Sequence, residues 1–353
     1  MKIQEIFHNN ASLKGRVANP YVIAEVGVNH EGDFDLARRL IEEAAEGGAD
    51  AVKFQTYKAE TLASRHSPAY WDISKEATKS QFELFSKYDK FWKKEYEKLK
   101  EICSVNNVDF MSTPFDRESA EFLNDLMDVY KIASADITNK PLVEQISSYN
   151  KPILLSTGAA NLDEIHAATG WIRENHEGDI ALLHCILNYP CENRNANLGM
   201  IRGLQAEFPD YVIGYSDHTL PGDMQVLELA SILGAQILEK HFTHDKSLPG
   251  NDHYHAMDKD NLKSFRNKMK NIHELIGSYV KTAIPSEDPA REHARRSLVA
   301  ARDIPAGTAL VAEDLISKRP AHGISPAFIE DVVGRTTKVS IVEDDLLSWD
   351  QLA

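Results

Sequence analysis

Two histidines late in the chain have the residue type and the position to bind a metal ion. His218 lies in the segment SDHT and His241 in EKHFTHD, each at the end of a short apolar run. Neutral imidazoles suit borderline divalent ions such as Mn, Co or Zn. The nearby His244, His253 and His255 are either competing ligands or loop residues. The alternative is that His218 and His241 are hydrogen-bonded polar residues and bind no metal.

Two lysines interrupt otherwise apolar runs, Lys53 in AVKFQ and Lys131 in VYKIA. A buried lysine is energetically costly unless it is paired or functional. Either one of the two is a desolvated Schiff-base nucleophile, or both of them hold an anion. Hydroxyl side chains at the ends of other runs favour the anion, namely Thr113, Ser134, Ser156 and Ser216.

The segment STGAANLDEI also favours an anion. It places small residues and free N–H groups at a predicted helix start, where a phosphate is stabilised. Ordinary capping of that helix by Asn161 explains part of the same pattern.

Glu25, in AEVGVNH, is the first carboxylate that follows an apolar run. If it faces the lysines and a metal, it is either their charge partner or a general acid/base, and its spacing does not distinguish the two roles. Further polar candidates on nearby loops, each equally explained as a hydrogen-bonded loop residue, are Asp136, Tyr189, Asp217 and Asp252.

The candidate residues recur at the ends of eight short apolar runs within the first 245 residues. Helical patterns separate most of these runs. Eight strands with reactive side chains at their carboxyl ends predict a (β/α)8 TIM barrel, whose active site gathers at that rim. The predicted strands are residues 21–26, 51–54, 108–111, 129–133, 152–155, 180–183, 212–215 and 237–242.

The first crossover between strands illustrates the pattern. Asp33 is a suitable N-cap for a helix with 3.6-residue apolar periodicity over residues 36–45, and Gly47-Gly48 ends it. Because the next strand follows at once, we expect parallel strands joined by right-handed crossovers.

Residues 57–90 form a long insertion between the second strand and its helix. It carries SPAYWD and, together with the residues just after it, several aromatic side chains. A connection of this length at the rim is typical of a lid or a substrate-facing loop. The alternative is a surface excursion with a small aromatic cluster.

A change of composition marks the end of the predicted barrel, which we place at residues 1–280. A helix near residues 259–279 leads into a linker rich in proline and charge, residues 281–297. Residues 298–353 have short alternating runs and predict a small β-rich module. Modules below ~70 residues rarely have much core of their own, so we expect this one to lean on a barrel, its own or a neighbour's.

Composition narrows the class of protein. The 353 residues carry a net charge of −15, which argues against nucleic acid as a partner. A small anionic substrate needs only a few cations, and the rim offers Lys53, Lys131 and Lys240. The start MKIQEIFHNN does not resemble a signal peptide, no apolar run approaches the ~18 residues of a membrane helix, and three cysteines form no paired framework. We therefore expect a cytoplasmic protein with no membrane partner.

The segments that carry these residues resemble the sialic acid synthase family, also called nonulosonate synthases. The matching segments are AEVGVNHEGD, AVKFQTY, MSTPFD, YKIASAD, ILLSTGA, LLHC followed by NYP, IGYSDHT and LEKHFT. RRSLVAARDIPAGT and KRPAHGISP resemble the antifreeze-like (SAF) domain that follows the barrel in that family. The resemblance covers nearly the whole chain in order, which makes it far more specific than any single motif.

The resemblance implies condensation of phosphoenolpyruvate with an open-chain N-acylated aldose, giving a nine-carbon 3-deoxy-2-keto acid and phosphate. His218 and His241 would hold a divalent ion, Mn²⁺ or Mg²⁺, that polarises the aldehyde. The predicted catalytic residues are Glu25, Lys53, Lys131 and Asp136. Positions that match those holding the phosphate and carboxylate of phosphoenolpyruvate are Lys53, Thr113, Lys131, Ser134, Ser156 and Ser216. Positions that match sugar contacts are Gln55, Tyr189 and Asp252.

The family also implies a domain-swapped homodimer. In such a dimer the tail domain covers the barrel of the other subunit, and Arg319, in KRP, would reach the sugar there. This agrees with the separate expectation that so small a module leans on a barrel.

The chain departs from the family pattern on the sugar side. Asp136 stands where many members have Glu, Leu187 where some have Asn, and KRPAHG and LPGNDHYHAMD differ from the commoner forms. The acceptor is therefore either N-acetylmannosamine, the default, or a 2,4-diacetamido sugar leading to legionaminic or pseudaminic acid. Outside this reaction, the alternatives are a Schiff-base aldolase and a non-catalytic sugar-binding protein.

Overall fold

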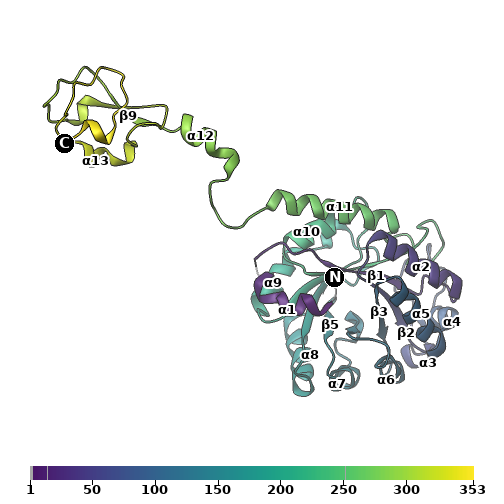
Figure 1. The fold of residues 1–353 in the computed structure, drawn as a ribbon. Helices are drawn as coiled ribbons and strands as arrows, with labels where there is room; N and C mark the ends of the chain where they lie inside the picture. Colours follow the sequence, from purple (N-terminus) through teal and green to yellow (C-terminus); the bar gives the residue numbers. More distant parts are fainter. Residues whose placement is uncertain (1–2, 14, 251) are drawn as a thin grey trace. The chain divides into compact units, whose positions relative to one another are not determined.

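Eight parallel strands form one sheet in the first of the two units into which the chain divides, residues 1–276 and 277–353 (Figure 1). The computed structural model describes residues 3–13, 15–250 and 252–353. The hydrogen-bonded order is β3-β2-β1-β8-β7-β6-β5-β4, and β3 packs against β4, which closes a barrel. The strands are β1 Tyr21–Gly27, β2 Ala51–Thr56, β3 Asp109–Pro114, β4 Tyr130–Ile132, β5 Ile153–Ser156, β6 Ile180–Cys185, β7 Val212–Asp217 and β8 Ile237–His241. The predicted (β/α)8 barrel is confirmed, and each strand begins within one residue of its predicted start.

Helices surround this barrel (Figure 1). They are α1 Ile3–Leu13, α2 Phe34–Gly47, α3 Ala59–Leu62, α4 Gln81–Tyr88, α5 Lys93–Val105, α6 Arg117–Leu123, α7 Lys140–Ser148, α8 Leu162–Asn175, α9 Gly199–Glu207, α10 Gln225–Ile232 and α11 Lys259–Ile276. Helix α2 has the predicted ends: the Asp33 side chain accepts from the N–H groups of Asp35 and Leu36, and Gly48 is left-handed at φ 97°.

Alternate positions along each strand point into the barrel and out toward the helices. On β1, Tyr21 and Ile23 belong to the inner apolar cluster, whereas Val22 and Ala24 belong to the outer one. All four are fully buried, as expected where both faces of a parallel sheet are covered. The same alternation directs the side chain of Glu25 into the barrel at the carboxyl end of β1.

Helix α1 closes the opposite end of the barrel. Its residues Ile3, Ile6 and Phe7 share the inner cluster with Tyr21 and Val212, which begin β1 and β7. The strand starts are therefore sealed by apolar packing, and the polar side chains are left at the carboxyl rim.

The insertion at residues 57–90 folds into two short helices, α3 and α4, and an ordered loop. Tyr57 packs edge-on against Phe85 at 5.4 Å, and the indole N–H of Trp71 donates to the carbonyls of Glu76 and Thr78. These contacts hold the insertion in a defined conformation.

The second unit contains a two-stranded antiparallel sheet, β9 Ser297–Ala300 with β10 Leu315–Lys318. Nine buried residues form a core of its own, among them Leu298, Ile324 and Leu347. The proline-rich stretch that precedes it contains a short helix, α12 Asp288–His293. A further single turn, α13 Ile329–Val332, lies within the module.

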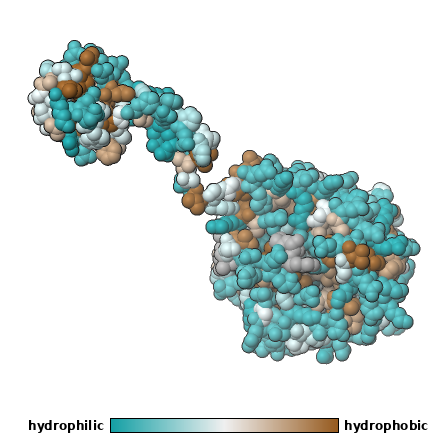
Figure 2. Space-filling view, viewed as in Figure 1, coloured by the Kyte–Doolittle hydropathy of each residue, from teal (hydrophilic) through white to brown (hydrophobic). Residues whose placement is uncertain are grey.

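Hydrophilic side chains cover most of the visible face of the barrel unit (Figure 2). Within the described ranges, no helix combines the length and the apolar character required to span a bilayer.

Replacement of glycine by alanine should change the free energy of unfolding in opposite directions at two positions. An added Cβ at Gly214 of β7 would lie 2.6 Å from the carbonyl oxygen of Ile237 in β8. Because that contact is with backbone, Gly214→Ala should lower the free energy of unfolding by about 1–3 kcal/mol. Gly170, exposed in α8, has no atom within 4 Å of such a Cβ. Gly170→Ala should raise stability by about 0.5–1 kcal/mol. Urea unfolding followed by circular dichroism measures both, and equal effects would contradict the close β7–β8 approach.

Candidate active site

A cavity of about 500 Å³ opens at the carboxyl rim of the barrel, and each of the eight strands contributes to its lining. The predicted catalytic, substrate-binding and metal-ligating residues of the first unit line it: Glu25, Lys53, Gln55, Thr113, Lys131, Ser134, Asp136, Ser156, Tyr189, Ser216, His218, His241 and Asp252. Arg319 belongs to the second unit, and its role stays a prediction.

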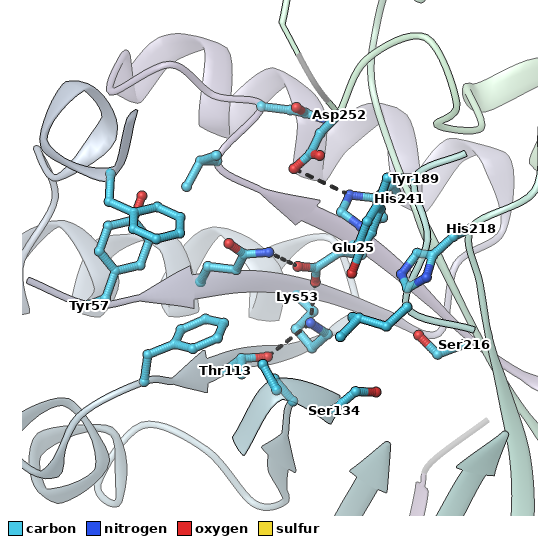
Figure 3. A pocket seen from close by; sticks show the side chains of 18 of the residues that line it. Glu25, Lys53, Tyr57, Thr113, Ser134, Tyr189, Ser216, His218, His241 and Asp252 are labelled. Carbon is cyan, nitrogen blue, oxygen red and sulfur yellow. Dashed lines mark hydrogen bonds and ion pairs between the residues drawn. The ribbon is translucent and has the colours of Figure 1, made fainter. Parts of the chain in front are cut away.

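Four buried charged groups alternate in sign on the inner wall. The Lys53 ammonium pairs with the Glu25 carboxylate and lies 3.7 Å from Glu239, and Lys131 lies 3.9 Å from the other side of Glu239. All four side chains are at most 8% exposed. Figure 3 shows Lys53 between Glu25 and Thr113, whose hydroxyl accepts from the ammonium at 3.0 Å. Two cations and two carboxylates balance one another inside the barrel.

The pKa values in this network move in opposite directions. Burial lowers the pKa of Lys53, but Glu239 and Glu25 outweigh it and hold the pKa above its usual value. Burial lowers the pKa of Lys131, and the neighbouring Lys53 lowers it further. Burial together with Glu239 raises the pKa of Glu25 to about 7, although Lys53 opposes the shift. Glu25 therefore exchanges its proton near neutral pH.

Hydroxyl groups adjoin the lysines. Ser216 donates to Glu239 at 3.0 Å, and Ser134 accepts from the Gly158 N–H at 2.9 Å and also interacts with Cys185. The buried Ser156 hydroxyl has no hydrogen-bond partner among the described residues. An anionic ligand would satisfy the Ser156 hydroxyl. The start of α8 contributes less than expected, because Asn161 accepts from Glu164 N–H and caps the helix.

The two histidines have the chemistry of metal ligands. Their rings are 5.5 Å apart, centroid to centroid, and both face the cavity (Figure 3). Nδ1 of His218 lies 2.8 Å from the carbonyl of Ile186, to which it can only donate, so its Nε2 carries the lone pair. Nδ1 of His241 faces Asp252 at 3.7 Å, which leaves its Nε2 for a ligand. Burial holds the pKa of His241 well below its usual value, which keeps this imidazole neutral.

Two of the three competing histidines, His253 and His255, have other polar neighbours, although His253 also lines the cavity. His253 lies 2.8 Å from the Thr243 hydroxyl, and the fully buried His255 lies 3.6 Å from Asp252. Among the residues that the structure describes, the only set of three mutually close ligands is Glu292, His293 and His322, all exposed in the second unit. In the barrel, a metal would have two protein ligands, His218 and His241, and oxygens of solvent or substrate would complete its coordination.

One sequence expectation was wrong. Lys240 was expected among the cations of the rim, but it pairs with Asp217 at 2.7 Å, and both side chains are 1% exposed. For Asp217 the structure agrees with the alternative of a hydrogen-bonded residue, since it accepts from the Thr219 N–H at 2.9 Å. Since Ser216 and His218 face the cavity, strand alternation points Asp217 outward, and the same holds for Lys240 between Glu239 and His241.

Sequence reasoning also missed Glu239 as a site residue. Its position two residues before His241 places both on the same strand face, which was the available signal. Cys185, at the end of β6, lines the cavity as well, with its Sγ 3.7 Å from Nδ1 of His218.

The insertion faces the cavity, as one of its two interpretations predicts. Its contribution is mainly apolar and aromatic and consists of Tyr57, Leu62, Tyr70, Trp71, Gln81, Leu84, Phe85 and Tyr88. The cavity thus has an ionic inner part and an aromatic outer wall.

Comparison with known proteins gives consistent matches along the chain. A family model described as NeuB family matches residues 40–281, and one described as SAF domain matches residues 295–353. An N,N'-diacetyllegionaminic acid synthase of Legionella pneumophila is 36% identical over 351 residues, 98% of each chain. A synthase of the same name from Campylobacter jejuni is 38% identical over 331 residues, 92% of this chain and 98% of the relative. The crystal structure of an N-acetylneuraminic acid (sialic acid) synthetase from Leptospira borgpetersenii, in complex with citrate, is 34% identical with a TM-score of 0.67, and the match covers 77% of this chain and 90% of that one.

The pKa of Glu25 can be tested in the protein without substrate. A glutamate carboxyl carbon should titrate with a midpoint near pH 7 in ¹³C NMR, and Glu25→Gln should remove that signal. Lys53→Met should move the midpoint upward, because loss of the cation disfavours the carboxylate. If the titration stayed near 4.5, or if Lys53→Met lowered it, the described charge network would be wrong.

Proposed function

The chain belongs to the NeuB family of sialic acid synthases, and we propose that it joins phosphoenolpyruvate to an open-chain N-acylated aldose, forming a nine-carbon 3-deoxy-2-keto acid and releasing phosphate. One arrangement supports this above all: two buried lysines, two buried carboxylates and two histidines share one cavity at the barrel rim. Such a set suits an anionic donor and an aldehyde acceptor in the same site.

The donor occupies the ionic part of the cavity in this proposal. Lys131 and Lys53 face its phosphate and carboxylate, and the hydroxyls of Thr113, Ser134, Ser156 and Ser216 complete the contacts. The unpartnered Ser156 hydroxyl supports this placement.

The acceptor lies between the histidines and the aromatic wall. A divalent ion, Mn²⁺ or Mg²⁺, bound by His218 and His241 would polarise the aldehyde as a Lewis acid. Gln55, Tyr189 and Asp252 contact the sugar hydroxyls and amide in this placement.

Bond formation joins C3 of the enol to the aldehyde carbon, and positive charge develops at C2. Glu25, as a carboxylate beside Lys53, stabilises that charge and accepts a proton from the water that adds to C2. The proton taken by Glu25 passes to the alkoxide formed from the aldehyde oxygen. The tetrahedral product then collapses to the C2 ketone, and its C2 hydroxyl proton leaves with the phosphate, whose departing charge Lys131 balances. Asp136 lies on the acceptor side, where Asn139 donates to one of its carboxylate oxygens at 3.0 Å.

Two observations favour a 2,4-diacetamido-trideoxyhexose over N-acetylmannosamine as acceptor. The wall formed by Leu62, Tyr70, Trp71, Leu84 and Phe85 offers apolar surface for a methyl group and a second acetamido group. Two relatives that are 36% and 38% identical and cover 98% and 92% of the chain are named as N,N'-diacetyllegionaminic acid synthases. The product would then be a legionaminic acid type of sugar.

A Schiff-base aldolase is the second candidate, because burial and Lys53 lower the pKa of Lys131. Lys53 is the weaker nucleophile of the two, since its carboxylate neighbours keep it charged. The two mechanisms differ in their response to a chelator and to borohydride.

Phosphate release from phosphoenolpyruvate should require both Mn²⁺ and an acceptor, and EDTA should abolish it. His218→Ala and His241→Ala should each lower the rate by at least about 100-fold, since Lewis-acid stabilisation is worth several kcal/mol. Among N-acetylmannosamine, its 6-phosphate and 2,4-diacetamido-trideoxyhexoses, we expect the highest kcat/KM for a diacetamido sugar.

His166→Ala serves as the matched control, because His166 is exposed on α8 and pairs with Glu207 outside the barrel. It should leave the rate unchanged. Activity that survives EDTA and is trapped by borohydride on Lys131 would establish the aldolase instead.

We further propose a cytoplasmic homodimer in which Arg319 of one subunit reaches the acceptor in the barrel of the other. The three cysteines are free and buried, which suits a reducing compartment. Arg319 also supplies a cation to a strongly acidic chain.

Shared active sites can be tested by mixing inactive variants. Arg319→Ala and the double variant His218→Ala/His241→Ala should each be inactive alone. If sites are shared between subunits, a mixed dimer restores one intact site, and about a quarter of wild-type activity should return after exchange in a 1:1 mixture. Light scattering establishes the dimer. No recovery in verified mixed dimers would place Arg319 in the site of its own chain or in no site.

A further inference from the structure

A buried ion pair lies directly behind the two metal-site histidines. Nζ of Lys240 donates to Oδ2 of Asp217 at 2.7 Å and to the carbonyl of Thr219 at 2.5 Å. Both charged side chains are 1% exposed and point away from the cavity. Neither takes part in the chemistry proposed above, so two buried charges remain to be explained.

The pair joins two strands at the level of the site. Asp217 and Lys240 are register partners in β7 and β8, one step beyond the partners Ser216 and Glu239. His218 follows Asp217 and His241 follows Lys240. A one-residue slip between these strands would turn every side chain to the opposite face. The ion pair opposes such a slip at the point where both histidines leave the sheet.

Asp217 also fixes the turn that carries His218. Its Oδ1 accepts from the Thr219 N–H at 2.9 Å and from the Tyr215 hydroxyl at 2.9 Å, and its Oδ2 accepts from the Thr219 hydroxyl at 3.1 Å. Lys240 holds the Thr219 carbonyl from the neighbouring strand. The backbone on both sides of His218 is therefore tied to one carboxylate and one ammonium.

Fixation of the backbone around His218 is important because the barrel supplies only these two imidazoles, those of His218 and His241, as the proposed protein ligands of a metal. With few protein ligands, affinity depends strongly on their being held at the correct separation beforehand. We propose that the Asp217–Lys240 ion pair is a positioning element that sets the separation of His218 and His241 for metal binding. The inference rests on the proposed metal-dependent function.

The test compares Mn²⁺ affinity with stability in the full chain. In Asp217→Asn/Lys240→Met, the asparagine Oδ1 can still accept from Thr219 N–H and Tyr215, whereas the link from β8 is lost. Mn²⁺ titration followed by the EPR signal of the free ion should show binding weakened by about 10–100-fold, the range found for partners that orient metal ligands. Unfolding midpoints are measured on the same samples.

Arg266→Met is the matched control. Arg266 pairs with Asp50 and donates to the carbonyls of Gly48 and Pro20, near the amino-terminal ends of β1 and β2. Its loss also removes a partly buried ion pair between α11 and the barrel. Mn²⁺ affinity should stay within about twofold of wild type, since the site is distant.

The outcomes separate the possibilities. Equal Mn²⁺ affinity in the folded double variant and the wild type, or equal weakening by Arg266→Met, would overturn the positioning role. Absence of Mn²⁺ binding by the wild type would instead overturn the metal site of the proposed function, and with it this inference. If the double variant does not fold, Tyr215→Phe removes one hydroxyl donor to Asp217. It should weaken Mn²⁺ binding by a few-fold, and unchanged affinity in that variant would also overturn the proposal.

Discussion

The structure depends on the placement of four charges inside a barrel that has little water to solvate them. An isolated buried ion costs several kcal/mol, and removing one member of a buried pair is far more destabilising than replacing both. Lys53 and Lys131 are stabilised because Glu25 and Glu239 lie among them. Glu25 and Lys53 are register partners on the neighbouring strands β1 and β2, whereas Lys131 on β4 meets Glu239 on β8 only across the interior of the closed barrel. The complete network of four charges therefore forms only when the barrel is closed, and the pairing of these charges in turn stabilises the closed barrel.

Strand alternation divides the ionic groups into two sets with different tasks. Glu239 and His241 face inward from β8, and Lys240 between them faces outward. The inward set meets ligands and can change its protonation, because Glu25 titrates near neutral pH. The outward pair of Lys240 and Asp217 is buried, and each side chain has at least two hydrogen-bond partners. A short sequence such as EKH therefore contains both a reactive face and a supporting face.

The sequence was sufficient for the strands and for most of the cavity lining. Apolar runs that end in polar residues located the strand starts to within one residue, and Asp33 and Gly48 marked the ends of α2. The wrong assignment of Lys240 arose because a lysine after an apolar run does not reveal which face it occupies. The alternation that runs through His241 contained that information. Glu25 was anticipated as a charge partner of the lysines, but Glu239 was not, since it lies almost the whole barrel away in sequence and meets Lys53 only because β8 pairs with β1.

The aromatic wall has a different origin from the ionic part of the cavity. It comes mainly from the insertion at residues 57–90, which has its own internal hydrogen bonds, such as those from Trp71, and does not belong to the barrel alternation. Changes in Tyr70 or Leu84 can therefore alter the shape of the acceptor side without disturbing Lys53 or Glu25. The departures from the family pattern at Leu187 and Asp136 also line the cavity. The ionic part and the aromatic wall are therefore built by separate parts of the chain, the barrel strands and the insertion, so either one can change without a change in the other.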